Sequence, residues 1–469
     1  MAIKIYNTLS GTKENLSAPA KGKPVRLFVC GPTVWNYLHI GNARTYIVFD
    51  SFAKFLRSQD VKTFYLQNIT DIDDKIINQA VAEHTTPALV AKKYQKIFMN
   101  NMKNLNVTAV DKYAPATKFI KEIIKQVKTL ITKDYAYKIN NDGYYFDLKK
   151  FPDYGQLARR TIEQAEDGVT RIDQSVNKRN AGDFCLWKFP KPGEPTWKAD
   201  FGAGRPGWHI EDTAISEKFF GPQYDIHGGG ADLKFPHHEA EIAQQESASG
   251  TKPMVKIWMH VGLLTFSGKK MSKSLGNFIT IKEFLKNYPA EALRFLALGN
   301  HYRSPLDYSE ENILAAVQAL NSIKEFIIKL ELVSSVKNRP IKKASMIPLL
   351  EKSETAFTAA LADDFNTPEA LAALFNFINE ANKSLWKVGF NEAKMINKWL
   401  ADKMSIFGIK LKIAKIPSKI AKLSKKRELF RIHKQFAESD ALRKEIDALG
   451  YKVEDTPLGP LVLKVKSEI

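Results

Sequence analysis

The apolar and polar residues near the start of the chain alternate between short apolar runs and a helical pattern. The run Arg26-Leu27-Phe28-Val29-Cys30 is closed by Gly31-Pro32, which is typical of a buried strand followed by a turn. From Ala43 to Arg57 apolar side chains recur at i, i+3 and i+4, which predicts an amphipathic helix, and Val61–Ile69 predicts the next strand. Strand, helix and strand at this spacing predict an α/β fold with a parallel, doubly wound sheet.

The pattern changes several times further along the chain. A basic helix and a polar, Gly- and Pro-punctuated stretch follow Thr117, sheet-like sequence resumes near Tyr224 and Val255, and helical periodicity dominates after Asn312. We therefore expect six segments: a first half of the sheet domain (1–116), a connective insertion (117–201), the second half of the sheet domain (202–254), a lysine-loop segment (255–311), a helical bundle (312–408), and a basic linker with a small terminal unit (409–469).

The charge of the chain points to an acidic partner. The 469 residues carry a formal net charge of +19, and between Lys410 and Lys434 there are ten Lys or Arg residues and one acid, Glu428. A charge excess serves solubility as readily as nucleic-acid binding. Clustering near one end favours a surface for a polyanion, because neutralised phosphates release their counterions.

Cysteine content and hydropathy bear on the expected cellular location of the protein. The two cysteines, Cys30 and Cys185, cannot form a disulfide framework, so we expect a cytoplasmic protein. No apolar run reaches the roughly eighteen residues of a membrane span, and the first residues lack the apolar core of a signal peptide.

Two short motifs suggest phosphate chemistry, although each has a plainer interpretation. His39-Ile40-Gly41-Asn42 opens the first predicted helix, where free N–H groups and the helix dipole suit a phosphate. A turn capped by polar residues explains this tetrapeptide equally simply. Lys270-Met271-Ser272-Lys273-Ser274 lies between Ser267-Gly268 and Gly276-Asn277, so it predicts a polar loop whose lysines either neutralise transferring phosphates or are merely solvated.

Together the two motifs resemble the paired nucleotide signatures of class I aminoacyl-tRNA synthetases, and further stretches resemble cysteinyl-tRNA synthetases. The similarity runs in the family's order over nearly the whole chain. The stretches that carry it are Phe28-Val29-Cys30-Gly31-Pro32-Thr33-Val34, Asn68-Ile69-Thr70-Asp71-Ile72-Asp73-Asp74-Lys75, Gly204-Arg205-Pro206-Gly207-Trp208-His209-Ile210-Glu211, Asp225-Ile226-His227-Gly228-Gly229-Gly230, Phe235-Pro236-His237-His238-Glu239-Ala240-Glu241 and Asp364-Phe365-Asn366-Thr367-Pro368-Glu369-Ala370-Leu371.

The resemblance implies a Rossmann-type catalytic domain that joins L-cysteine and ATP, with Mg, into cysteinyl-adenylate and then loads tRNA(Cys). We also expect a monomer. It implies the following roles: phosphate stabilisation by His39, Asn42, Lys270 and Lys273; nucleotide binding by Gly41, His209, Gly229 and Asp232; and an amino-acid pocket lined by Thr70 and Trp208.

A metal site is suggested partly by the residues themselves. His237 and Glu241 are four apart and share one helix face, and Cys30 at the end of a strand can complete a zinc site with them. Without Cys30, a surface pair is the commoner explanation. The resemblance implies that zinc binds the sulfur of the substrate, which distinguishes cysteine from serine. Where the family has a further cysteine ligand this chain has Asp212, a harder ligand of the same charge.

The terminal segment resembles an anticodon-binding unit. By resemblance, Arg431, Asp440 and Asp455 fall where the family reads anticodon bases, although surface charge on a small helical cap explains each of them singly. The family's terminal tryptophan is absent, and Gly459-Pro460-Leu461-Val462 stands in its place.

Two rival functions follow from the same residues. One is a ligase that joins cysteine to a small amine, against which the basic tail argues. The other is an inactive RNA-binding paralogue, which Asp212 favours and the lysine loop opposes.

Overall fold

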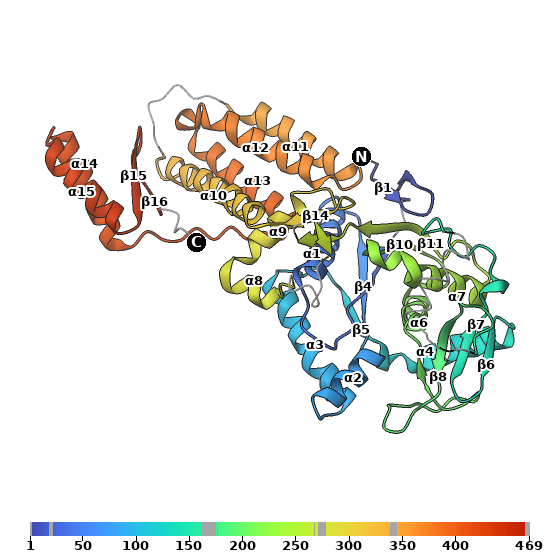
Figure 1. Cartoon of the computed structure of the whole chain (residues 1–469). Helices are drawn as coiled ribbons and strands as arrows, with labels where there is room; N and C mark the ends of the chain where they lie inside the picture. The colour runs from blue at the N-terminus through green and yellow to red at the C-terminus, as the bar shows by residue number, and fades with distance from the viewer. Residues whose placement is uncertain are drawn as a thin grey trace. The chain divides into compact units, whose positions relative to one another are not determined.

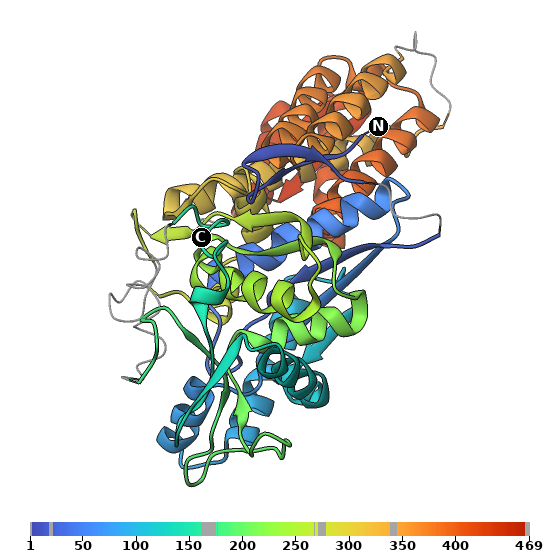
Figure 2. The ribbon, with the colours of Figure 1, turned by 90° about the vertical axis from the view of Figure 1, so that its right-hand side faces the viewer.

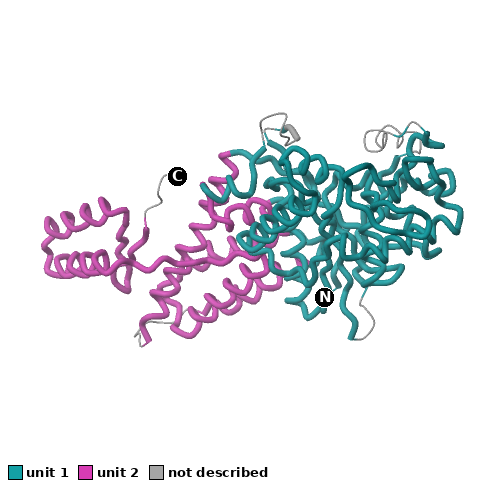
Figure 3. The backbone as a smooth tube through the Cα atoms, turned by 90° about the horizontal axis from the view of Figure 1, so that it is seen from below, with its two compact units in different colours: residues 1–286, 300–309, 362–366 teal, residues 287–299, 310–361, 367–469 magenta. Residues whose placement is uncertain are grey.

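The computed structural model describes residues 2–17, 22–160, 175, 177–266, 268–270, 278–337 and 345–464. The chain forms two compact units (Figure 3). Unit 1 comprises Met1–Lys286, Asn300–Ser309 and Ala362–Asn366, and unit 2 comprises Asn287–Gly299, Glu310–Leu361 and Thr367–Ile469. The finer division into six segments stays a prediction.

Unit 1 is built on a five-stranded parallel sheet in the order β11-β10-β3-β4-β5. The strands are β3 (Val25–Val29), β4 (Thr63–Ile69), β5 (Lys112–Pro115), β10 (Tyr224–Gly230) and β11 (Val255–Val261). This arrangement confirms the predicted α/β fold. Because all five strands are parallel, the residues that follow β3, β4 and β10 meet at one edge, where open α/β sheets bind ligands.

Helices join and flank these strands (Figure 1). They are α1 (Ile40–Ser58), α2 (Asp74–Ala82), α3 (Pro87–Asn104), α4 (Ile120–Thr132), α6 (Ile210–Phe220) and α7 (Glu239–Ser249), of which α4, α6 and α7 pack against one another. The predicted helix at 43–57 corresponds to α1, which begins three residues earlier at the motif His39-Ile40-Gly41-Asn42.

The expected insertion at 117–201 contains three strands of a four-stranded antiparallel sheet in the order β6-β7-β8-β9, and the fourth strand, β9, lies just beyond its expected end. Its strands are β6 (Ala136–Ile139), β7 (Gly143–Phe146), β8 (Phe184–Lys188) and β9 (Arg205–Pro206). Near the N-terminus, β1 (Lys4–Asn7) pairs with β2 (Thr12–Asn15). In the lysine-loop segment, β12 (Leu264–Phe266) lies between β13 (Lys269–Lys270) and β14 (Leu306–Tyr308) in a small sheet, and α8 (Ile281–Asn287) comes between β13 and β14 in the chain.

The described part of unit 2 consists mainly of helices, with one hairpin near its end (Figure 1 and Figure 2). Its helices include α9 (Ala290–Leu298), α10 (Glu310–Val333), α11 (Ile347–Ala362), α12 (Thr367–Asn382) and α13 (Phe390–Ile406). The C-terminal part contains α14 (Ser418–Ile432), α15 (Phe436–Ala448), β15 (Tyr451–Thr456) and β16 (Gly459–Lys464) around a small core of Ile420, Ile446 and Val453. Among the described residues, no helix is both long and apolar enough to cross a membrane.

Candidate active site

A cavity of about 450 Å³ opens at the carboxyl edge of the parallel sheet. It is lined by residues from the start of α1, from the loops after β3, β4 and β10, and from the start of α6. Nine of the side chains and glycines expected from the sequence lie on its wall, namely Cys30, His39, Gly41, Asn42, Thr70, Trp208, Asp212, Asp232 and His237. The topology therefore brings residues more than 200 positions apart into one site.

The start of α1 forms one wall of the cavity. His39 caps the helix: its Nδ1 accepts a hydrogen bond of 3.0 Å from the N–H of Gly41, and its own N–H donates to Asn42 Oδ1 at 3.3 Å. Because Nδ1 accepts, the neutral ring carries its hydrogen on Nε2, which is a donor. A Cβ at Gly41 would lie 2.7 Å from His39 Nδ1, so only glycine leaves room for this cap.

Two of the expected nucleotide-binding residues lie outside the cavity wall as the structure describes it. His209 is buried, and its Nδ1 lies 2.8 Å from Nδ1 of His237, so it contacts a candidate metal ligand. A Cβ at Gly229 would lie 2.9 Å from the ring of His238, so this glycine makes room for an imidazole. Lys270 is described only as part of β13, and Lys273 lies outside the described residues.

The predicted metal ligands Cys30, Asp212, His237 and Glu241 come together, and all four are buried. His237 Nε2 lies 3.1 Å from Asp212 Oδ2 and 3.0 Å from Glu241 Oε1. Glu241 Oε1 is also 3.8 Å from the sulfur of Cys30. Helix spacing and strand position predicted Cys30, His237 and Glu241, the family resemblance added Asp212, and all four are neighbours in space.

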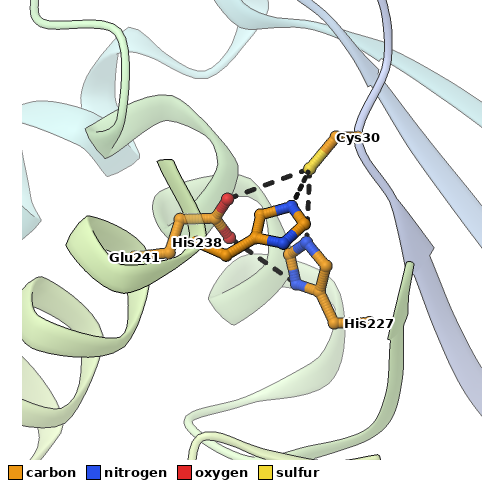
Figure 4. Close-up of side chains that lie close together, drawn as sticks. All are labelled: Cys30, His227, His238 and Glu241. Carbon is orange, nitrogen blue, oxygen red and sulfur yellow. Dashed lines mark hydrogen bonds and ion pairs between the residues drawn. The ribbon is translucent and has the colours of Figure 1, made fainter. Parts of the chain in front are cut away.

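A second donor set shares two of these residues (Figure 4). The sulfur of Cys30 lies 3.2 Å from Nε2 of His227 and 3.2 Å from Nε2 of His238, and Glu241 completes the set. Sequence reasoning did not assign these two histidines. The signal was present, since His227 lies in the stretch Asp225–Gly230 and His238 directly follows a predicted ligand.

Hydrogen bonds fix the orientation of the two additional histidine rings. His227 Nδ1 lies 2.6 Å from the hydroxyl of Tyr224, and His238 Nδ1 lies 2.8 Å from Nε2 of His260. In both rings the other nitrogen, Nε2, faces the sulfur of Cys30. Metal-ligating histidines are usually held in this manner through the nitrogen that does not bind the metal.

Electrostatics favour a cation among these groups. Burial, and then the carboxylates Glu241 and Asp212, raise the pKa of the Cys30 thiol well above its ordinary value. Burial and Asp212 also raise the pKa of Glu241, whose Oε2 is buried and lacks a hydrogen-bond partner among the described residues. A divalent ion would compensate this excess of acidic groups, and sulfur, imidazole and carboxylate donors are those that zinc prefers. The buried cluster can therefore hold a metal ion.

Next to Asp212 the cavity contains a polar network that includes Asn68 and Glu211, neither of which was predicted as a site residue. The amide of Asn68 donates to Asp212 Oδ1, and its Oδ1 accepts from the N–H of Gly31 at 2.5 Å. Thr70 Oγ1 donates to Glu211 Oε1 at 2.9 Å. Asn68 therefore orients the carboxylate that stands where the family usually has cysteine.

Aromatic contacts complete this wall. The ring of Trp208 stacks on His237 with centroids 4.5 Å apart. The ammonium of Lys75, which also lines the cavity, lies 6.0 Å from the centroid of the Trp208 ring. The indole thus packs directly against a candidate metal ligand.

In the C-terminal part, two of the three expected anticodon residues form an ion pair. Arg431 Nη1 lies 3.1 Å from Asp455 Oδ2, and both side chains are partly exposed. Asp440 is exposed on α15. A further arginine, Arg427, binds Asp455 from the buried side and was not predicted.

The parallel sheet and the cavity at its carboxyl edge, joined to a helical unit, are those of a class I aminoacyl-tRNA synthetase. Residues 16–318 match the family of tRNA synthetases class I (C) catalytic domains, and residues 356–412 match the DALR domain. The chain is 41% identical to the cysteine–tRNA ligase of Thermococcus onnurineus over 98% of its own length and 99% of that protein. It is 42% identical to that of Thermoplasma volcanium, covering 96% of this chain and 97% of that one. The chain belongs to the family of cysteine–tRNA ligases, which are ATP-dependent class I synthetases.

Solved structures of other synthetases share the fold. Methionyl-tRNA synthetase from Mycobacterium tuberculosis, in complex with methionyl-adenylate, aligns with a TM-score of 0.60 at 15% identity over 82% of this chain and 87% of that one. A leucyl-tRNA synthetase of Agrobacterium radiobacter aligns with a TM-score of 0.63 at 11% identity, over 84% and 85% of the two chains. At such low identity the likeness concerns the fold alone.

Proposed function

We propose that this chain activates L-cysteine with Mg-bound ATP to form cysteinyl-adenylate and then transfers the cysteinyl group to the 3′ end of tRNA(Cys). The observation that carries the proposal is similarity to cysteine–tRNA ligases over nearly the full length, combined with a cavity lined by the start of α1 and by Cys30, Asp212 and His237 of the donor cluster. In the first step a carboxylate oxygen of cysteine attacks the α-phosphorus and pyrophosphate leaves. In the second step a ribose hydroxyl of the tRNA attacks the carbonyl and AMP leaves.

The residues around the cavity have distinct proposed roles in these steps. The ATP phosphates lie against the start of α1, where His39 and Asn42 face the cavity and Gly41 permits close approach. Lys270 and Lys273 stabilise the charge that develops on the leaving pyrophosphate. Gly229 and Asp232 bind the nucleotide in this proposal, while the contact of His209 with His237 supports a role near the metal donors.

Thr70 and Trp208 line the pocket for the cysteine substrate. Trp208 packs on His237, and Thr70 bonds to Glu211, so both have defined positions. This part of the cavity adjoins the donor cluster, which suits a side chain that ends in sulfur.

We further propose that Cys30, Asp212, His237 and Glu241 hold the zinc ion. Cys30, Asp212 and His237 line the cavity that the substrate enters, whereas neither His227 nor His238 is found on the described wall. When bound, zinc would coordinate the thiolate of cysteine, which serine cannot match. The other donor set, which contains His227 and His238, is the alternative position for the ion.

Cysteine-dependent ATP–pyrophosphate exchange tests the first step. We expect exchange with cysteine and little or none with serine, followed by charging of tRNA(Cys). An absence of exchange would favour the inactive RNA-binding paralogue. Exchange without tRNA charging, but with transfer to a small amine, would favour the rival ligase. Sedimentation of the purified chain tests the expected monomer.

Metal analysis of matched variants tests the zinc proposal. We expect about one zinc ion per chain, because four ligands form one tetrahedral zinc site. Asp212→Ala should lower both zinc content and cysteine activation, and Asp212→Cys should retain or tighten the metal because a thiolate is a softer ligand. If His227→Gln removes the zinc while Asp212→Ala does not, the ion occupies the other donor set. An active enzyme without metal would refute both assignments.

Finally, we propose that Arg431, Asp440 and Asp455 contact anticodon bases. Exposed arginine and carboxylate groups can pair with the edges of unstacked bases, and this part of the chain carries the clustered basic charge. Charging assays with tRNA(Cys) transcripts that carry substituted anticodon bases test these contacts.

A further inference from the structure

We propose that Arg427 is a positioning residue that holds the carboxylate of Asp455 in the orientation needed to recognise a nucleotide base. The inference rests on the proposed role of Asp455 in reading the anticodon, and it deepens that role. Arg427 lies on α14 and Asp455 on β15, so their contact joins a helix to the hairpin.

The contact between these residues is bidentate. Arg427 Nη1 donates to Asp455 Oδ1 at 2.6 Å, and Nη2 donates to Oδ2 at 3.0 Å. Two parallel hydrogen bonds fix both the place and the plane of a carboxylate, which a single bond does not. Arg427 is therefore able to set the direction in which the remaining lone pairs of Asp455 point.

Burial divides the arginines around Asp455 into an inner and an outer one. The side chain of Arg427 is fully buried, whereas those of Arg431 and Asp455 are each 42% exposed. Arg431 Nη1 reaches Asp455 Oδ2 at 3.1 Å. A base can therefore reach Arg431 and the outer side of Asp455 but not Arg427, which must act through its partner.

The charge of Asp455 follows from the same contact. Arg427, together with Arg431, holds the pKa of this carboxyl below its ordinary value. An ionised carboxylate is an acceptor only, so it accepts from the amino groups of bases and repels groups that cannot donate.

A purely structural role for Arg427 is the competing explanation. Arg427 does tie α14 to β15 beside the small core of Ile420, Ile446 and Val453. An apolar side chain would join the two elements as well, because buried ion pairs often contribute no more stability than well-packed apolar residues. What a guanidinium adds at this position is the orientation and ionisation of an exposed carboxylate.

Charging kinetics of four full-length variants test the proposal: Asp455→Asn, Arg427→Met, Arg427→Lys and the double variant of Asp455→Asn with Arg427→Met. For each, kcat and KM are measured with tRNA(Cys) and with transcripts that carry one substituted anticodon base. We expect Asp455→Asn and Arg427→Met each to reduce discrimination between transcripts by about tenfold, the loss typical of one hydrogen-bonded pair to a base. The effect should appear in KM for tRNA, with cysteine activation unchanged.

The double variant decides whether Arg427 acts through Asp455. We expect it to discriminate no worse than Asp455→Asn alone, and we expect Arg427→Lys to recover part of the discrimination. A matched control is Lys426→Met, which removes an exposed charge from the same helix and should weaken charging of all transcripts equally.

The outcomes separate this inference from the function on which it rests. If Asp455→Asn leaves discrimination unchanged, the proposed anticodon role of Asp455 is wrong. If Asp455→Asn reduces discrimination but neither Arg427 variant does, the positioning role of Arg427 is wrong. It is also wrong if the loss of discrimination in the double variant equals the product of the losses in the two single variants. Should Arg427→Met fail to fold, Arg427→Lys in both backgrounds gives the same comparison.

Discussion

Replacing Arg44 by methionine should destabilise unit 1 strongly. Its side chain is fully buried on α1. Nη1 donates to the carbonyls of Gly262 and Leu263 at 2.7 and 3.0 Å, and Nη2 donates to those of Ser304 and His301 at 2.7 and 3.3 Å. One guanidinium thus ties α1 to two loops, one of which lines the cavity.

The magnitude follows from two opposing effects. Methionine matches the length of the arginine stem but removes all four hydrogen bonds. The carbonyls of Leu263 and His301 still accept from the N–H groups of Leu306 and Ser304 at 2.9 and 3.0 Å, whereas those of Gly262 and Ser304 are left unpaired. Each buried unpaired group costs about 1–3 kcal/mol, and each of the other two lost hydrogen bonds costs about 0.5–1.5 kcal/mol. Against this, burial disfavours the charge of Arg44 and lowers its pKa to about 10, and methionine removes that cost, which is on the order of 3 kcal/mol at 1.36 kcal/mol per pKa unit. We expect a net loss of about 3 kcal/mol, and a fall in the unfolding temperature of roughly 6 °C or more.

Calorimetry and urea unfolding of matched variants provide the assay. Arg57 lies on the same helix, its side chain is 34% exposed, and it binds Asp111 at 2.6 Å. Arg57→Met should therefore cost at most about 1 kcal/mol. Equal and small effects of Arg44→Met and Arg57→Met would refute the reasoning, because burial and the number of acceptors would then not decide the cost.

Three further predictions concern activity and pH. Lys273→Ala should slow cysteine-dependent pyrophosphate exchange by about a hundredfold or more without changing the unfolding temperature, and near-normal exchange would contradict its assignment. Removal of the residues after about Leu411 should weaken tRNA charging much more than cysteine activation, and an equal loss of both would indicate a role in stability. Arg427 lowers the pKa of Asp455 in the folded state. The ion pair between the two residues therefore stabilises the fold fully above the ordinary aspartate pKa of about 3.9. This stabilisation is lost as the pH falls through the lower pKa of the folded state. Hydrogen exchange in β15, corrected for intrinsic rates, should therefore accelerate below about pH 4 in the parent but much less in Asp455→Asn.

The regular elements were predictable because their patterns are local. Apolar runs identified β3, β4, β10 and β11, and helical periodicity identified α1. The terminal hairpin was missed. Only Val453 and Leu461 are buried in its two strands, so the alternation of apolar and polar residues is weak. The turn of the hairpin uses Gly459 at φ +102°, which the sequence shows only as one more glycine.

Contacts between distant elements were not predictable in the same way. His237 and Glu241 share a helix face, so their proximity follows from spacing alone. Asn68 and Asp212 are 144 residues apart, and Arg44 and Gly262 are 218 apart. Such partners are determined by how the sheet is assembled, and the local periodicity of the sequence does not predict them.

The bond between Asn68 and Asp212 bears on how the proposed zinc site differs from that of the family. One oxygen of Asp212 accepts from the Asn68 amide and the other lies 3.1 Å from His237 Nε2, so the carboxylate offers a single oxygen toward the donor cluster. Sulfur is a weak acceptor, so a thiolate in Asp212→Cys would leave the buried amide of Asn68 poorly paired. The gain in zinc affinity from the softer ligand should then be partly offset, and it should grow when Asn68 is also replaced by an apolar residue of similar size, such as leucine.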